Sequence, residues 1–183
     1  VSHHVRTPLA LIMGWAEQLE RDAVLPETAR QKAGGIRTMT PLEALKLYFG
    51  YDSFRPGQEE IVSRLLAGQD VLAVMPTGAG KSICYQVPAL LLPGITIVVS
   101  PLVSLMKDQV GALVQAGVAA AFLNNSLTDN QKALMLRRAR EGWYKIIYVA
   151  PERLEMPGFQ RFAQERPISM VTVDEAHCIS QWG

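Results

Sequence analysis

The segment that decides the fold reads VLAVMPTGAGKS and runs from Val71 to Ser82. Its apolar, β-branched first half predicts a strand over 71–75, and the pattern that follows predicts a helix from Lys81 onward. The turn between them fits the GxxxxGK(S/T) phosphate-binding pattern, except that Met75 stands where the pattern has its first glycine. A strand, a glycine turn and a helix in this order predict a loop that binds nucleotide phosphates.

The chemistry expected of this loop follows from its residue types. Gly78 and Gly80 allow backbone N–H groups to turn inward around phosphates, toward which the helix directs its positive end. The Lys81 ammonium suits the β- and γ-phosphates, and the Ser82 hydroxyl suits Mg²⁺. We therefore expect ATP to bind at Thr77, Gly78, Ala79, Gly80, Lys81 and Ser82. The alternative is a chance glycine turn that opens a helix, which the apolar strand before it disfavours.

Short β-branched runs alternate with longer helical patterns after residue 39. Alternation of this kind predicts an α/β fold with an open parallel sheet and right-handed crossovers. Further strands are predicted over 96–100, 119–123, 145–150 and 170–174, and helices over 41–49, 58–66, 81–91, 102–116 and 128–140. Ligands of such sheets bind beyond the carboxyl ends of the strands, which is where the motifs fall.

The strand predicted over 170–174 runs directly into the tetrapeptide DEAH, which ends at His177. Asp174 is placed to hold Mg²⁺, directly or through water, and Glu175 could orient and deprotonate the attacking water. Both carboxylates could instead lie in a solvated turn, but the phosphate loop upstream favours catalysis. His177 could be an ordinary surface histidine, or it could link the nucleotide site to a bound nucleic acid. The candidate catalytic residues are thus Lys81, Asp174, Glu175 and His177.

Composition and charge narrow the possible classes of protein. The chain has 183 residues, of which 49% are hydrophobic and 19% charged, enough for one globular domain. The net charge of +1 is too small to attract nucleic acid to the chain as a whole, so any contact with DNA or RNA must come from local residues. Two cysteines, Cys84 and Cys178, cannot form a disulfide scaffold or a four-thiolate zinc site. We see no membrane span and no signal peptide, and expect a cytoplasmic protein without a membrane partner.

Five motifs together resemble those of RecQ DNA helicases, in order from residue 39 to the last residue. They are YFGYDSFRPGQ (48–58), MPTGAGKS (75–82), VSPLVSLMKDQ (99–109), YVAPERL (148–154) and DEAHCISQWG (174–183). The resemblance implies a RecA-like P-loop NTPase lobe with a parallel sheet flanked by helices, over residues 39–183. It also implies ATP-dependent 3′–5′ DNA unwinding in DNA repair and recombination, with ATP and Mg²⁺ as cofactors.

Further residue roles follow from the same resemblance. Gln58 would hydrogen-bond the adenine base, with Tyr51 and Arg55 packing on its two faces. The segments 100–109 and 150–154 would hold the DNA backbone through hydroxyls and amides. The candidate nucleic-acid contacts are Ser100, Pro101, Ser104 and Trp182, the last by stacking on an unpaired base. Without the resemblance, Tyr51 could equally be a core residue, and Trp182 would be interpreted as packing.

The resemblance also implies partners. Single-stranded or forked DNA is the expected substrate, in the bacterial cytoplasm at the nucleoid. A second RecA-like lobe is expected to be required in cis, because it brings an arginine finger to the γ-phosphate. We expect a lobe that is incomplete at its C-terminus and does not unwind DNA alone. An RNA helicase of the same superfamily is an alternative, which the ending ISQWG and the 51–58 segment disfavour.

The first 38 residues form a separate piece with a different resemblance. SHHVRTPL (2–9) is similar to the phosphoacceptor box of sensor histidine kinases, and an apolar stripe from Val5 to Leu19 predicts an incomplete helical hairpin. The resemblance implies that the hairpin might dimerise and that His3 would accept phosphate. However, His4 stands where the family has an acidic residue. A phosphorelay module fused to a passenger ATPase lobe is therefore the second functional hypothesis, and residues 1–38 could also be a fusion artefact.

Overall fold

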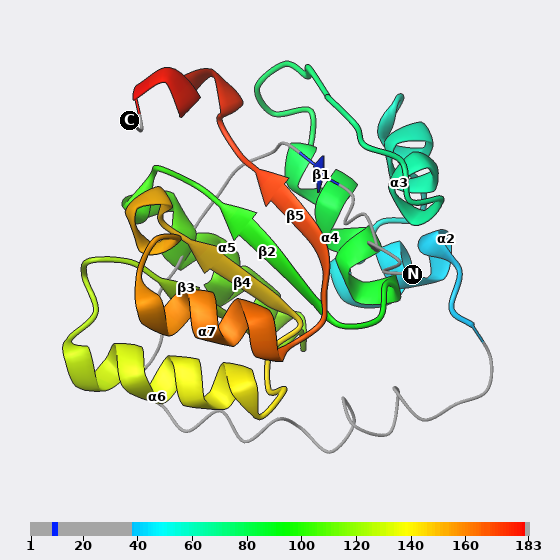
Figure 1. Ribbon diagram of the computed structural model, residues 1–183. Coiled ribbons are helices and arrows are strands. Elements are labelled where there is room, and N and C mark those ends of the chain that lie inside the picture. The colour runs from blue at the N-terminus through cyan, green and yellow to red at the C-terminus, as the bar shows by residue number, and fades with distance from the viewer. Residues whose placement is uncertain (1–8, 11–37, 182–183) are drawn as a thin grey trace, which may run out of the picture.

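The computed structural model describes Leu9–Ala10 and residues 38–181, and it shows an α/β fold built on one parallel sheet (Figure 1). The strand order is β1-β5-β2-β4-β3, and every pairing is parallel. The strands are β1 (Leu9–Ala10), β2 (Ile95–Val99), β3 (Ala120–Leu123), β4 (Ile146–Val149) and β5 (Ile168–Val173). The predicted parallel α/β architecture is confirmed.

Helices cover both faces of this sheet. In Figure 1, α7 (Pro157–Glu165) lies in front of the strands with α6 (Asp129–Arg140) packed beside it, and α5 (Val103–Gln115) lies behind them. The α4 helix (Lys81–Leu91) contacts β5, and α2 (Pro41–Ala44) and α3 (Gln58–Leu66) pack against α4. Because helices lie on both faces, every residue of β2, β3 and β4 is buried, as expected for the central strands of a parallel sheet.

Two helices begin at capping boxes that the sequence encodes. The Thr40 hydroxyl accepts a hydrogen bond from the Glu43 backbone, and the Glu43 carboxylate accepts one from the Thr40 backbone N–H. Thr128 and Gln131 form the same reciprocal pair at the start of α6. The helix predicted over 41–49 continues from α2 as a π-helical turn, η1 (Leu45–Phe49), before it ends at a left-handed glycine. The α3 and α4 helices have the bounds predicted from the sequence.

The strand predicted over 71–75 is wrong as a member of the sheet. Only Val71 makes an isolated bridge, and the next four residues have no regular structure. The segment keeps the alternation of a strand, since Val71, Ala73 and Met75 pack against the core. Leu72 and Val74 are 73% and 91% exposed. A strand needs a neighbour to supply its ladder hydrogen bonds, and β1, not this segment, pairs with β5.

A second correction concerns the N-terminal piece. The apolar stripe predicted a helix through Leu9 and Ala10, but these two residues form β1, in register with Val171 and Thr172 of β5. Backbone hydrogen bonding at a sheet edge here prevails over the helical pattern of side chains. The remainder of the predicted hairpin, including His3, lies outside the described residues.

One helix and two short 3₁₀ segments were not predicted. The α7 helix begins with Pro157 in its first turn and buries Phe159 and Phe162, whose rings are 5.8 Å apart. The 3₁₀ segments are η2 (Pro151–Arg153) and η3 (Ala176–Gln181), which follow β4 and β5 at the carboxyl edge of the sheet. Among the described residues, no helix is long and apolar enough to span a membrane.

Candidate nucleotide-binding site

The predicted phosphate loop lies directly before α4, and two of its glycines have left-handed backbones. Gly78 has φ 79° and Gly80 has φ 76°, and Gly80 is the N-cap of α4. A Cβ atom on Gly80 would lie 2.6 Å from the Gln58 amide nitrogen. Gly80 is therefore fixed by both its backbone conformation and the lack of space.

Met75 explains the departure from the glycine pattern. Its side chain is partly buried against the core, and its sulfur lies 3.7 Å from the Cys84 thiol. A methionine sulfur makes favourable contacts in such irregular apolar surroundings. Position 75 thus holds the start of the loop against α4 by packing, while the bend of the loop itself comes from the later glycines.

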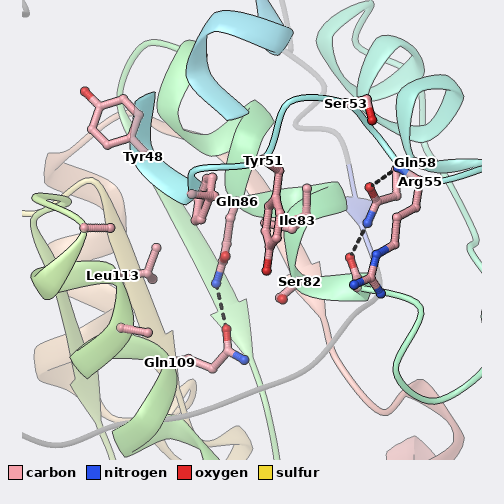
Figure 2. A pocket seen from close by; sticks show the side chains of 14 residues that line it. Tyr48, Tyr51, Ser53, Arg55, Gln58, Ser82, Ile83, Gln86, Gln109 and Leu113 are labelled. Atoms are coloured by element: carbon pink, nitrogen blue, oxygen red, sulfur yellow. Dashed lines mark hydrogen bonds between the residues drawn. The ribbon is translucent and has the colours of Figure 1, made fainter. Parts of the chain in front are cut away.

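Two side chains from the segment before α3 hold the loop from outside. The Arg55 guanidinium donates to the carbonyl oxygen of Gly78 at 2.6 Å, and the Gln58 amide donates to the carbonyls of Gly80 at 2.9 Å and Ala79 at 3.3 Å. Gln58 in turn accepts from the Arg55 backbone N–H at 2.8 Å. Figure 2 shows the Gln58 and Arg55 side chains side by side at one end of the pocket.

These bonds set the direction of the loop's backbone N–H groups. The carbonyl and N–H of a trans peptide point in opposite directions. Because Gln58 holds the carbonyls of Ala79 and Gly80, the N–H groups of Gly80 and Lys81 face away from it, at the N-terminus of α4. Backbone donors at a helix N-terminus form an anion-binding site, so the loop is preorganised for phosphate.

A pocket of about 360 Å³ lies beside the loop and brings the predicted adenine-reading residues together. Tyr51, Arg55 and Gln58 line it together with Ser82 of α4 (Figure 2). The Tyr51 ring is half exposed, which leaves a face free for a flat ligand. Gln58, in contrast, is buried and already uses its amide on the loop. The site therefore gathers these residues, and their contact with adenine stays a prediction.

Asp174 follows β5 and is completely buried. Its backbone N–H donates to the carbonyl of Val99 at 2.8 Å, which continues the β5–β2 pairing to the end of the strand. Oδ1 accepts from the Glu175 N–H at 2.8 Å, whereas Oδ2 is buried without a hydrogen-bond partner among the described residues. Burial raises the pKa of Asp174 to about 8, and the Glu175 charge adds to that rise. The Glu175 N–H, the nearby Ser100 hydroxyl and the Lys81 charge lower the pKa and oppose it.

Glu175 has an unusual backbone and a defined partner. It is the one non-glycine residue with positive φ, at 45°, in the described part of the chain. Its Oε2 lies 2.8 Å from Nδ1 of His177, whose side chain is 73% exposed. Residues held in left-handed conformations cost free energy and concentrate at functional sites. The turn thus aims a partly buried carboxylate next to Asp174 and fixes it with an imidazole.

The residues present fit both Mg²⁺ and a nucleoside triphosphate. Mg²⁺ prefers oxygen ligands, and the unpartnered Oδ2 of Asp174 and the Ser82 hydroxyl are of that kind. A cation near Asp174 would also remove the free-energy cost of a buried carboxylate. The Lys81 ammonium and the N–H groups of Gly80 and Lys81 suit the phosphates.

A family comparison agrees with this geometry. The model of DEAD/DEAH box helicases matches residues 55–183, which include Arg55, Gln58, the phosphate loop and the DEAH tetrapeptide. The chain belongs to the DEAD/DEAH box helicase family. The sheet and the helices around it are accordingly the RecA-like lobe of such a helicase.

Curated relatives place the similarity among RecQ-type enzymes. The chain is 49% identical over 148 residues to the ATP-dependent DNA helicase RecQ of Haemophilus influenzae, covering 81% of this chain and 24% of that protein. It is 51% identical over 137 residues to the RecQ of Bacillus subtilis, covering 74% and 23%. It is 48% identical over 139 residues to the ATP-dependent DNA helicase Q-like 5 of Arabidopsis thaliana, covering 75% and 15%. The chain spans about a quarter or less of these relatives' length.

The predicted DNA contacts of this helicase lobe lie in different environments. Ser100 is completely buried, and its hydroxyl accepts from the Leu102 N–H at 3.4 Å. Pro101 is partly exposed, and Ser104, in the first turn of α5, is exposed. Trp182 lies outside the described residues. Of the three described residues, Pro101 and Ser104 thus offer surface to a nucleic acid, and all four contacts stay predictions.

Sequence reasoning missed a buried polar network behind the loop. The hydroxyls of Tyr85 and Tyr148 are 2.8 Å apart, and the Gln86 amide donates to the Tyr148 hydroxyl at 3.2 Å. The same amide donates to Gln109 at 2.7 Å (Figure 2). The network joins α4, which begins at the phosphate loop, to β4 and α5. A glutamine within the apolar run ICYQVPALL is the signal that could have indicated it.

Proposed function

We propose that this chain is the nucleotide-binding lobe of a RecQ-type, ATP-dependent DNA helicase. The observation that carries the proposal is the pairing of a preorganised phosphate loop with Asp174, a buried carboxylate whose Oδ2 makes no hydrogen bond to the described residues. The similarity to proteins named ATP-dependent DNA helicase supports DNA as the substrate class. Residues 39–183 form the lobe in this proposal, and Leu9–Ala10 of the N-terminal piece add the edge strand β1 to its sheet.

The residues divide the work of hydrolysis among themselves. Lys81 and the loop N–H groups bind the β- and γ-phosphates, while Ser82 and Asp174 hold Mg²⁺. When bound, Mg²⁺ neutralises charge on the phosphate oxygens. Glu175 orients a water and accepts its proton as the water oxygen attacks the γ-phosphorus and the bond to the ADP oxygen breaks. The products are ADP and inorganic phosphate.

His177 acts on this reaction through Glu175. The 2.8 Å contact between His177 Nδ1 and Glu175 Oε2 orients the carboxylate. His177 is mostly exposed, so a ligand at the surface can reach it and shift the position of Glu175. In our proposal His177 is therefore a positioning residue that couples DNA binding to hydrolysis.

The pocket beside the loop holds the base in this proposal. Tyr51 and Arg55 lie against the adenine faces, and Gln58 bonds its edge by giving up one of its loop contacts. Gln58 contacts both the base and the loop in this proposal. Binding of the base therefore changes the hydrogen bonds that Gln58 makes to the phosphate-binding loop.

DNA is proposed to contact Ser100, Pro101, Ser104 and Trp182, with 3′–5′ unwinding in DNA repair and recombination. A second RecA-like lobe in cis would complete the site with an arginine at the γ-phosphate, which contributes on the order of 10³–10⁵ in rate in related enzymes. We place this activity at the nucleoid in the bacterial cytoplasm.

Nucleotide binding by the 183-residue chain tests the first half of the proposal. A fluorescent ATP analogue should bind in the presence of Mg²⁺, and Lys81→Ala should weaken binding by at least about tenfold because a phosphate loses a charged donor. Lys132→Ala is the matched control, since Lys132 lies on α6 and forms a salt bridge with Asp129 of the same helix. Equal affinity of Lys81→Ala and the control would contradict the proposed site.

Nucleic-acid preference tests the second half. Fluorescence anisotropy of labelled single-stranded DNA should rise on addition of the chain, and unlabelled DNA should compete better than RNA of the same sequence. If RNA competes better, the chain belongs to an RNA helicase instead.

A further inference from the structure

Three metal-binding side chains come together immediately after β5. Glu175, His177 and Cys178 place one ligand atom each within 4.8 Å of the other two. The carboxylate and the imidazole are already in contact at 2.8 Å. The Cys178 N–H donates to the Glu175 carbonyl at 2.7 Å, which closes a 3₁₀ turn. This backbone bond holds Cys178 close to Glu175.

The set of donors differs from the one proposed for Mg²⁺. Asp174 and Ser82 offer only oxygen, whereas Glu175, His177 and Cys178 offer oxygen, nitrogen and sulfur. Thiolate and imidazole suit Zn²⁺, and Mg²⁺ does not select them. Zinc binds its ligands at about 2.0–2.3 Å, so the ligand atoms must approach to roughly 3–4 Å from one another.

Access to the three side chains is open. His177 is mostly exposed, and Cys178 and Glu175 are partly exposed. Three protein ligands leave the fourth position of a tetrahedral zinc to water. The other cysteine cannot compete for the metal, because Cys84 is buried and burial raises the pKa of its thiol to about 11.

We propose that Glu175, His177 and Cys178 form a Zn²⁺ site that inhibits hydrolysis. Bound zinc occupies the Glu175 carboxylate and draws it away from the attacking water. The metal site stands on the three side chains alone, and only the inhibition rests on the proposed function. Zinc and Mg²⁺ therefore bind this lobe at different positions. Mg²⁺ supports ATP hydrolysis, and zinc inhibits it.

The first test uses Co²⁺ as a spectroscopic substitute for zinc in the 183-residue chain. Coordination by a thiolate gives an intense sulfur-to-cobalt charge-transfer band in the near ultraviolet, which oxygen and nitrogen ligands do not give. We expect this band on addition of Co²⁺ and its loss on addition of Zn²⁺. Cys178→Ser should abolish the band, and His177→Ala should weaken cobalt binding about tenfold or more. Cys84→Ala should leave the band unchanged. No thiolate band in the wild-type chain would overturn the proposal.

The second test needs no variant that could fail to fold. Iodoacetamide alkylates Cys178 in the wild-type chain at a rate followed by mass spectrometry of its peptide. Zn²⁺ should slow this alkylation at least about tenfold, and the same concentration of Mg²⁺ should not. Equal rates with and without Zn²⁺ would overturn the proposal. Neither readout depends on ATP, so their failure would leave the nucleotide site intact, and failure of Lys81→Ala to weaken ATP binding would leave the zinc site intact.

Discussion

The side-chain amide of Gln58 donates to the carbonyl oxygen of Gly80 at 2.9 Å, across 22 positions of sequence. This bond joins the segment proposed to read adenine to the loop proposed to hold phosphate. The Gln58 side chain is therefore proposed to have two roles: it contacts the base, and it holds the loop in shape. The first two predictions separate these two roles.

Gln58→Ala should weaken the binding of both ATP and GTP, because the loop loses a support whatever the base. ATP should lose an additional 0.5–1.5 kcal/mol, roughly 2- to 12-fold, if the amide also bonds the adenine edge. Parallel titrations of the two nucleotides measure both effects. Equal losses would exclude the contact with adenine, and an unchanged affinity for GTP would exclude the support of the loop.

Gly80→Ala should destabilise the chain more than Gly68→Ala. Both glycines have left-handed φ, 76° and 75°, so both variants incur a backbone cost of about 1–2 kcal/mol. A Cβ on Gly68 meets nothing within 4 Å, whereas one on Gly80 lies 2.6 Å from the Gln58 amide. Urea denaturation should show the additional loss only for Gly80→Ala. Equal losses in the two variants would mean that Gln58 moves aside without cost.

Asp174→Asn should stabilise the chain at alkaline pH in the absence of metal. The pKa of Asp174 is raised to about 8 from an ordinary 3.8, so the folded state favours the protonated carboxyl. This stabilisation is complete below about pH 4 and is lost as the pH rises toward 8. Asparagine cannot ionise, so the variant should exceed the wild type by on the order of 1–3 kcal/mol near pH 8 and by less near pH 5. Urea unfolding in chelator at the two pH values measures the difference, and a difference independent of pH would contradict the raised pKa.

Tyr148→Phe should cost more stability than Tyr51→Phe. The Tyr148 hydroxyl is buried and contacts both Tyr85 and Gln86, whereas the Tyr51 ring is half exposed. Removal of a buried partner costs about 1–3 kcal/mol for each group left unsatisfied. Thermal unfolding of the two variants should show this order. Equal losses would mean that the buried hydroxyl contacts do not contribute to stability.

The parts of the fold that local sequence specifies were predicted well. The α3 and α4 helices have the predicted bounds, because glycine turns precede them and their apolar residues recur at helical spacing. Strands β2 to β5 were found because unbroken β-branched runs suit a sheet buried on both faces. The position of the Asp174 and Glu175 carboxylates was predicted for the same reason, since they follow directly from a recognisable strand, and their catalytic role stays a prediction.

The parts that depend on distant partners were not predicted. Residues 71–75 have the alternation of a strand, but a ladder requires a neighbour that no local pattern supplies. Leu9 and Ala10 carried a helical pattern and instead pair with β5. The attachment of Gln58 to the loop also depends on a fold that brings position 58 to position 80. The glutamate, histidine and cysteine of the zinc proposal lie within residues 175–178, yet the turn of the backbone is what gathers their ligand atoms.

The most direct test of the nucleotide site is a pair of ATP titrations of the 183-residue chain, with Mg²⁺ and with chelator. The account predicts that Mg²⁺ strengthens ATP binding by the wild-type chain and by Glu175→Gln. Asp174→Asn should bind ATP with the same weaker affinity in both conditions, because the metal's buried ligand is gone. Full Mg²⁺ dependence in Asp174→Asn would contradict the account, since the metal would then be held elsewhere.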